Sequence, residues 1–195
     1  MQNENKFDTI IIGGGPAGSS AAAILAEQGH RVLVLEREKF PRYHIGESLL
    51  PFNYFPLKRL GLIDKMRASQ FVKKYSVQFI APSGKASQPF YFSSRYDKDI
   101  SETWQVLRSE FDEMLLNNAR EKGATVMEEM TVMELLRENV LPSSTRQNHG
   151  TPSAPSVSDA PTISAECDAA ARCVGVRVKN KSGEIQEFFA PITLD

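Results

Sequence analysis

Short apolar runs alternate with helical patterns along the first part of the chain. Residues 7–12, FDTIII, and residues 31–36, RVLVLE, are each rich in β-branched and aliphatic side chains, as buried parallel strands require. Between them lies SSAAAILAEQG, a small-residue segment that predicts a helix ending at Gly29. The pattern therefore predicts a βαβ unit within about 30 residues.

Further elements follow this unit. Residues 52–70 have an amphipathic helical pattern that Gly61 interrupts, and KYSVQFIAPSGKASQPFYFSS predicts two antiparallel strands joined by a turn at residues 82–84. WQVL predicts a short strand. Ser109 then predicts a helix N-cap, with Asp112 in the capping-box position. ATVME predicts a third parallel strand.

The last third of the chain changes character. Residues 142–168 hold almost no large apolar side chain, which predicts a disordered insertion or a long surface loop. CVGVRVKN and EIQEFFA, joined by KSGE, predict a hairpin, and PITLD predicts a last strand. The fold class is α/β, with a parallel sheet, a small β-meander and an extra antiparallel hairpin.

Composition narrows the function. The 195 residues carry a net charge of −1, which argues against nucleic acid as a partner. We expect no integral membrane segment and no signal peptide, because the apolar runs are short and the N-terminus is polar. Cys167 and Cys173 match no disulfide or metal framework, so we expect free thiols, no metal site and a cytoplasmic location.

The turn after the first strand carries a G-x-G-x-x-G motif. The first glycine allows a tight turn, the second admits a pyrophosphate to the backbone, and the third lets helix and strand pack closely. The helix N-terminus then favours phosphate. Glu36 ends the second strand, where it can accept hydrogen bonds from a ribose, and an acid there disfavours NADP. The loop residues expected at a dinucleotide are Gly13, Gly15, Pro16, Ala17 and Gly18.

A second segment, FPRYHIGESLLP at residues 40–51, packs special residues into one turn-prone stretch. Together with IIGGGPAGSSAA and QVLRSEFDEMLLNNAREKGATV, it resembles the flavin-dependent halogenases and their relatives among FAD monooxygenases and geranylgeranyl-reductase-like flavoproteins. The resemblance implies FAD as cofactor and a Rossmann-like domain of the glutathione-reductase or hydroxylase type over residues 1–195. That domain is expected to be incomplete at its C-terminal end, with the substrate domain largely missing.

The resemblance also implies roles for single residues. In the family the H-I-G-E-S segment passes beside the flavin, so Gly46 is expected to fix an irregular backbone path there. The role of His44 stays open between cofactor contact and local packing. Asp195 matches the first residue of the family's D-x-x-G motif, whose glycine this sequence does not contain. The further residues expected to contact the cofactor are Arg37, Arg42, Glu47, Ser48 and Arg108.

Lys74 is the candidate catalytic residue. FVKKYSVQF resembles the family's F-x-x-K-x-G-x-x-F, in which a lysine in a dry pocket directs the halogenating electrophile, but Ser76 replaces the glycine. Desolvation would lower the pKa of such a lysine. The adjacent Lys73 leaves open a solvated strand edge instead.

Three functions compete. The first is a halogenase or monooxygenase that uses reduced flavin and oxygen on an aromatic or pyrrole-like substrate, small or carrier-bound, with a separate flavin reductase as a partner. The second is a reductase of the geranylgeranyl-reductase type, and the third is a truncated FAD-binding fragment without catalysis. The redox chemistry in each enzyme would belong to the flavin, and the protein would supply binding and orientation.

Overall fold

The computed structural model describes residues 5–97, 99–139 and 171–195, so the insertion expected at residues 142–168 lies outside the described part. A parallel sheet in the order β11-β1-β2-β7 is the centre of the fold. Its strands are β1 (Thr9–Ile12), β2 (Val32–Leu35), β7 (Thr125–Met127) and β11 (Ile192–Leu194). Thr9 is in register with both Val32 and Ile192, and all three predicted parallel strands are confirmed.

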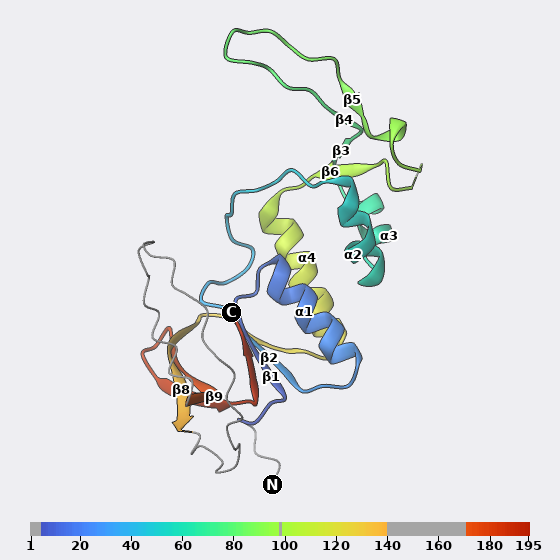
Figure 1. The fold of residues 1–195 in the computed structure, drawn as a ribbon. Coiled ribbons are helices and arrows are strands. Elements are labelled where there is room, and N and C mark those ends of the chain that lie inside the picture. The colour runs from blue at the N-terminus through green and yellow to red at the C-terminus, as the bar shows by residue number, and fades with distance from the viewer. Residues whose placement is uncertain (1–4, 98, 140–170) are drawn as a thin grey trace, which may run out of the picture.

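Two helices, α1 (Pro16–Glu27) and α4 (Arg108–Glu121), cover one face of this sheet, as Figure 1 shows. Ile11, Val32 and Val34 pack against the small residues of α1 and the apolar face of α4. This burial of apolar side chains on one stripe of each helix is the main stabilising contribution to the layer.

An antiparallel sheet in the order β10-β9-β8 covers the opposite face. Its strands are β8 (Met130–Asn139), β9 (Ala171–Asn180) and β10 (Ile185–Phe189), the last two forming the predicted hairpin. Ile10, Leu33 and Leu35 point to this side and pack on Val176 and Val178. Alternate residues of β1 and β2 thus serve two cores, which explains why both strands read as continuous apolar runs.

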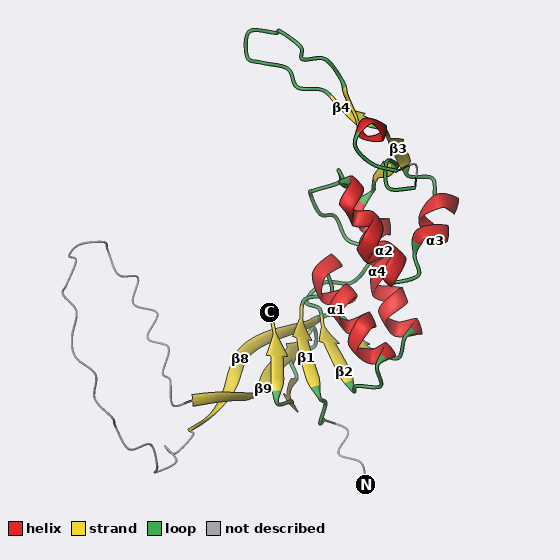
Figure 2. Ribbon diagram, turned by 45° about the vertical axis from the view of Figure 1, so that its right-hand side comes forward, coloured by secondary structure: helices red, strands yellow, loops and turns green. Residues whose placement is uncertain are grey.

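A smaller unit leads away from the helices and includes the predicted hairpin (Figure 2). Gly84, with φ +79°, donates its N–H to the Ala81 carbonyl at 2.8 Å and closes the predicted turn. The predicted helix at residues 52–70 is broken near Gly61, as expected. The elements of this unit are η1 (Pro51–Asn53), α2 (Tyr54–Arg59), α3 (Ile63–Ala68), β3 (Val72–Lys74), β4 (Ser76–Val77), β5 (Phe90–Tyr91), η2 (Phe92–Ser94) and β6 (Thr103–Gln105).

The predicted start of α4 is wrong. The helix begins at Arg108, its N-cap is Leu107, and no side chain caps it, so Ser109 is not the N-cap. With Leu107 as the N-cap, Asp112 lies five positions further on and not in a capping-box position, and its carboxylate accepts hydrogen bonds from Arg42 and Arg108. In the described residues, no helix is long and apolar enough to cross a membrane.

Candidate cofactor site

The glycine loop lies between β1 and α1. Gly13 has φ +99°, a conformation that L side chains rarely adopt, and its N–H donates to the Leu35 carbonyl at 2.8 Å. A Cβ on Gly18 would lie 2.0 Å from the Gly13 carbonyl oxygen. Ser19 is fully buried and its hydroxyl donates to the Gly14 carbonyl at 2.7 Å. The turn and the close packing that the motif predicts are therefore both present, and α1 begins at Pro16 beside them.

Glu36 joins this loop to the end of β2. Its side chain is buried, with 4% of the residue exposed. Oε2 accepts the Gly14 N–H at 2.7 Å, and Oε1 accepts the Glu38 N–H at 2.9 Å. A carboxylate oxygen can accept a second hydrogen bond, so Glu36 is held rigidly and still able to bind ribose hydroxyls. The site therefore fits the adenosine end of a dinucleotide.

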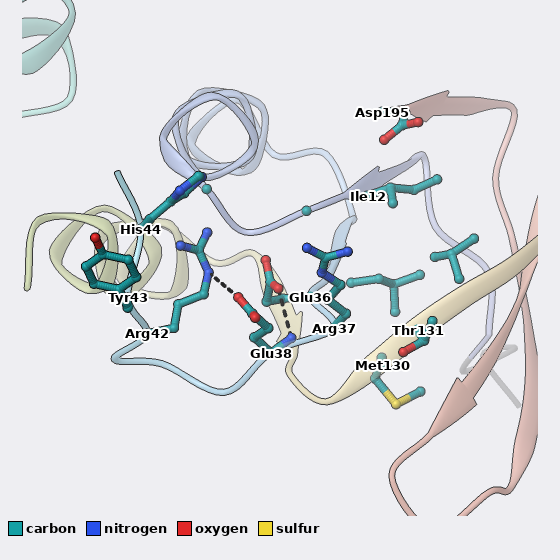
Figure 3. A pocket seen from close by; sticks show the side chains of 14 residues that line it. Ile12, Glu36, Arg37, Glu38, Arg42, Tyr43, His44, Met130, Thr131 and Asp195 are labelled. Atoms are coloured by element: carbon teal, nitrogen blue, oxygen red, sulfur yellow. Dashed lines mark hydrogen bonds and ion pairs between the residues drawn. The ribbon is translucent and has the colours of Figure 1, made fainter. Parts of the chain in front are cut away.

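A cavity of about 510 Å³ opens beside Glu36, and Figure 3 shows its lining. It brings together residues that lie far apart in the sequence, from the glycine loop, from the segment after β2, from β8 and from the end of β11. Met130 and Thr131 of β8 belong to it and were not predicted, because nothing in their local sequence marks them. The predicted residues that line it are Gly13, Gly15, Glu36, Arg37, Arg42 and Asp195.

A second cavity, of about 400 Å³, lies along the start of α1. Gly13, Gly15 and Asp195 line both cavities, so the two spaces share one border at the glycine loop. The other predicted residues that line this cavity are Pro16, Ala17 and Gly18. Both cavities are lined by Gly15, the N-cap of α1, and a helix N-terminus favours a bound phosphate group.

The H-I-G-E-S segment runs alongside β6. The Val106 N–H donates to the Glu47 carbonyl at 2.8 Å, and the Leu49 N–H donates to the Trp104 carbonyl at 3.0 Å. Gly46 has φ +102°, and a Cβ there would lie 3.1 Å from Arg108 Nη1. The backbone conformation therefore favours glycine at this position, and a Cβ there would also displace the end of the Arg108 side chain slightly.

Asp112 pairs with two of the predicted residues, and the sequence interpretation gave it only a capping role. It is fully buried on α4 and accepts hydrogen bonds from Arg108 Nε at 2.7 Å and Nη2 at 3.0 Å. Arg42 Nη1 lies 3.3 Å from the same carboxylate, and Arg42 Nε pairs with Glu38 at 3.2 Å. The i, i+4 spacing of Arg108 and Asp112 was the available signal.

Lys74 extends from β3 to the H-I-G-E-S segment. Its ammonium donates to the Ser48 hydroxyl and, at 3.0 Å, to the Leu49 carbonyl. Burial lowers the pKa of Lys74 below its ordinary value. Lys73 behaves differently, because it pairs with Glu102 at 2.8 Å, and that hydrogen bond raises the pKa of Lys73. The two adjacent lysines are therefore distinct, and only Lys74 contacts the predicted loop.

Several predicted residues lie outside the two cavities. The Glu47 side chain is exposed and accepts from Gln105 Nε2 at 3.3 Å. Gly46 and Arg108 instead line a mostly apolar cavity of about 280 Å³ between α1, α2 and α4. Ser48 and Lys74 line none of these three cavities.

His44 lines the larger cavity, and its Nδ1 accepts the Ile45 N–H at 3.0 Å. This local hydrogen bond is compatible with either of the roles left open for it. Within the described ranges, no group of three or more His, Cys, Asp or Glu residues is placed to hold a metal ion.

Comparison with known proteins agrees with this geometry. The family model of the tryptophan halogenases matches residues 8–95. Flavin-dependent halogenase armH4 of Armillaria mellea is 44% identical over 130 residues, covering 65% of this chain and 24% of that protein. Sulochrin halogenase gedL of Aspergillus terreus is 40% identical over 128 residues, covering 66% of this chain and 23% of that protein.

The fold comparison extends over more of the chain. The myxobacterial chondrochloren halogenase CndH superposes with a TM-score of 0.74 and 34% identity, covering 97% of this chain and 36% of that one. The fold is therefore the Rossmann-type fold of FAD-dependent halogenases, as predicted. The chain is related to the flavin-dependent halogenases by both sequence and structure, and it spans about a quarter of the length of the curated relatives it matches.

Proposed function

We propose that this chain is the FAD-binding part of a flavin-dependent oxidoreductase of the halogenase or monooxygenase type. The observation that carries this proposal is the buried Glu36 carboxylate, fixed by the Gly14 and Glu38 N–H groups at the edge of the 510 Å³ cavity. Glu36 would bind the adenosine ribose, and the loop from Gly13 to Gly18 would bind the pyrophosphate. Arg42 and Asp195 line the same cavity and would hold the remainder of the cofactor.

Reduced FAD, when bound, would supply the oxygen-dependent redox chemistry. The protein's own contribution would come from Lys74. Its partly buried ammonium contacts the Ser48 hydroxyl and the Leu49 carbonyl, and these contacts hold it against the loop expected beside the flavin. A lysine in this position would act as a hydrogen-bond donor that orients an electrophile toward an aromatic or pyrrole-like substrate, free or carrier-bound. We propose a separate flavin reductase as partner and a cytoplasmic location.

Two alternatives remain distinct from this proposal. Ser76 replaces the glycine of the lysine motif, so a reductase that needs no lysine is the second candidate. In the third, the chain binds FAD without catalysing a reaction. The dependence of product formation on halide separates these functions, because only a halogenase consumes halide.

The first experiment is the visible absorption spectrum of the purified chain after incubation with FAD and desalting. Retained flavin supports the cofactor site, and a colourless protein contradicts it. Product formation with reduced flavin, oxygen and an aromatic substrate is then compared with and without chloride or bromide. Lys74→Ala should abolish the halide-dependent product, whereas the matched variant Lys73→Ala should retain it. A product that needs oxygen but no halide in both variants would indicate monooxygenation. A reduced product that forms without oxygen would favour the second candidate.

A further inference from the structure

Asp112 is the shared partner of the two arginines expected at the cofactor. Arg42 and Arg108 come from different parts of the chain, one from the loop after β2 and one from the start of α4. Their side chains are only 12% and 11% exposed, and that of Asp112 is 0% exposed. A buried carboxylate is stable in its charged form when it is paired and hydrogen-bonded, as it is here.

Each arginine also lies close to one of the two segments expected at the cofactor. Arg108 Nη1 donates to the Ile45 carbonyl at 2.6 Å and to the Gly46 carbonyl at 3.3 Å. Arg42 Nη2 lies 3.6 Å from the point that a Cβ on Gly15 would occupy. Through Arg108, Asp112 is connected by hydrogen bonds to the H-I-G-E-S segment, and through Arg42 it is linked to a guanidinium that lines the same cavity as Gly15 of the glycine loop.

The contacts of Arg108 with Asp112 fix the orientation of the Arg108 guanidinium group. Arg108 uses Nε and Nη2 on the two oxygens of Asp112, and this bidentate contact fixes the plane of the group. Its remaining nitrogen, Nη1, is then aimed at the backbone carbonyls of the loop. A lysine could supply the charge but could not make both sets of contacts at once.

We infer that Asp112 is a positioning residue of the flavin site, which sets Arg42 and Arg108 in place and through them orders the H-I-G-E-S segment against the glycine loop. The inference rests on the proposed function for its cofactor. Asp112 itself faces two protein cations and lines none of the three cavities, so it acts through the arginines and not on the cofactor.

The test is a double-mutant cycle of Asp112→Asn and Arg108→Gln, with Glu110→Gln as the matched control on the same helix. Asp112→Asn should weaken FAD binding at least tenfold and lower the melting temperature, because it leaves two buried cations short of a partner. The double variant should regain part of the melting temperature, since it removes one of those cations, but should still bind FAD weakly. Glu110→Gln, an exposed site, should match the wild type in both.

A second measurement needs no flavin. The rate of tryptic cleavage after Arg42 in the ligand-free chain, followed by mass spectrometry, should rise in Asp112→Asn and in the double variant. If Asp112→Asn does not fold, Arg108→Lys replaces it, and cleavage within residues 42–46 should again accelerate. If the wild type binds no FAD, the proposed function is contradicted. If cleavage after Arg42 is nevertheless faster in the variants than in the wild type, the positioning role of Asp112 still holds.

Two results would overturn the inference. One is a double variant that regains both its melting temperature and wild-type FAD affinity, which would mean that Asp112 only balances charge. The other is unchanged cleavage of the loop in every folded variant, which would mean that the H-I-G-E-S segment is ordered without Asp112.

Discussion

Lys74 Nζ donates a hydrogen bond to the Leu49 carbonyl oxygen at 3.0 Å, across 25 positions of sequence. Lys74 stands on β3, which pairs with β6, and the segment from Glu47 to Leu49 pairs with the same β6. One short strand therefore fixes the distance between the candidate catalytic amine and the loop expected at the flavin. The position of Lys74 relative to this loop is therefore set by the backbone hydrogen bonds of β6.

The two adjacent lysines should titrate differently. Burial lowers the pKa of Lys74, and the hydrogen bond to Glu102 raises the pKa of Lys73. Because the neutral amine is the nucleophile, Lys74 should be acylated at lower pH than Lys73. Trace labelling across the alkaline range, with peptide mass spectrometry, measures both in one sample. Glu102→Gln should shift the profile of Lys73 and leave that of Lys74 in place. Identical profiles for the two lysines would contradict the environments described here.

Glu27 should control stability in acid. It pairs with Lys122 at 2.6 Å and with Arg59 at 2.5 Å, and these hydrogen bonds lower the pKa of Glu27 to about 2 from an ordinary 4.5. The unfolded chain therefore binds a proton more readily than the folded one, and the contribution of Glu27 is complete above pH 4.5. It is lost as the pH falls through about 2.

The measurement is the free energy of unfolding by urea at a series of pH values below neutrality. Glu27→Gln should flatten the pH dependence between 4.5 and about 2, and added salt should reduce the difference because the group is near the surface. Glu121→Gln is the matched control, since Glu121 is exposed and pairs with the single cation Lys65 at 2.9 Å. An equally steep acid dependence in the Glu27 variant would contradict the prediction.

Local sequence predicted much of the fold because the relevant signals were themselves local. The β-branched runs, the glycine turn and the small-residue helix each specify an element by short-range periodicity or backbone conformation. Gly13 and Gly18 could be assigned because φ and close packing restrict those positions to glycine. Arg42 and Asp195 were predicted only from the family resemblance, because no local sequence pattern singles them out. Both line the cavity beside Glu36.

The missed features depend on contacts between distant segments. Asp112 was expected at a helix N-terminus, but its partners are Arg108 within the helix and Arg42 from 70 positions earlier. The spacing of Ser109 and Asp112 gives no information about Arg42, which lies far away in the sequence and also binds the Asp112 carboxylate. Thr131 lines the cavity because β8 starts beside the end of β2, where the Met130 N–H donates to the Glu36 carbonyl at 2.8 Å, and this neighbourhood is set by the topology of the fold. The cofactor contact expected of Glu47 stays a prediction: its side chain is exposed, and its carbonyl accepts the Val106 N–H at 2.8 Å.

Gly18→Ala tests whether the close packing of α1 against β1 is needed for FAD binding, separately from the turn at Gly13. The added Cβ would meet the Gly13 carbonyl oxygen at 2.0 Å, a backbone atom that cannot rotate away, so α1 must shift from β1. We expect a loss of about 1–3 kcal/mol in the free energy of unfolding and loss of FAD after desalting. Gly84→Ala is the control: it has φ +79° and no atom near its Cβ, and it should cost roughly 1–2 kcal/mol while retaining FAD. Full FAD retention in Gly18→Ala would show that this packing does not shape the phosphate site.

Glu36→Gln should test the ribose site most directly. The side-chain amide can accept only one of the two hydrogen bonds from Gly14 and Glu38, because its NH₂ group must face the other donor. The orphaned N–H should cost about 1–3 kcal/mol, and FAD binding should weaken by roughly tenfold or more. Fluorescence titration with FAD measures the affinity, and competition with ADP and with its 2′-phosphorylated analogue measures selectivity. Wild type should bind the analogue poorly because the Glu36 carboxylate repels a 2′-phosphate, and the variant should narrow that gap. Equal affinity of wild type for both competitors would place the ribose away from Glu36.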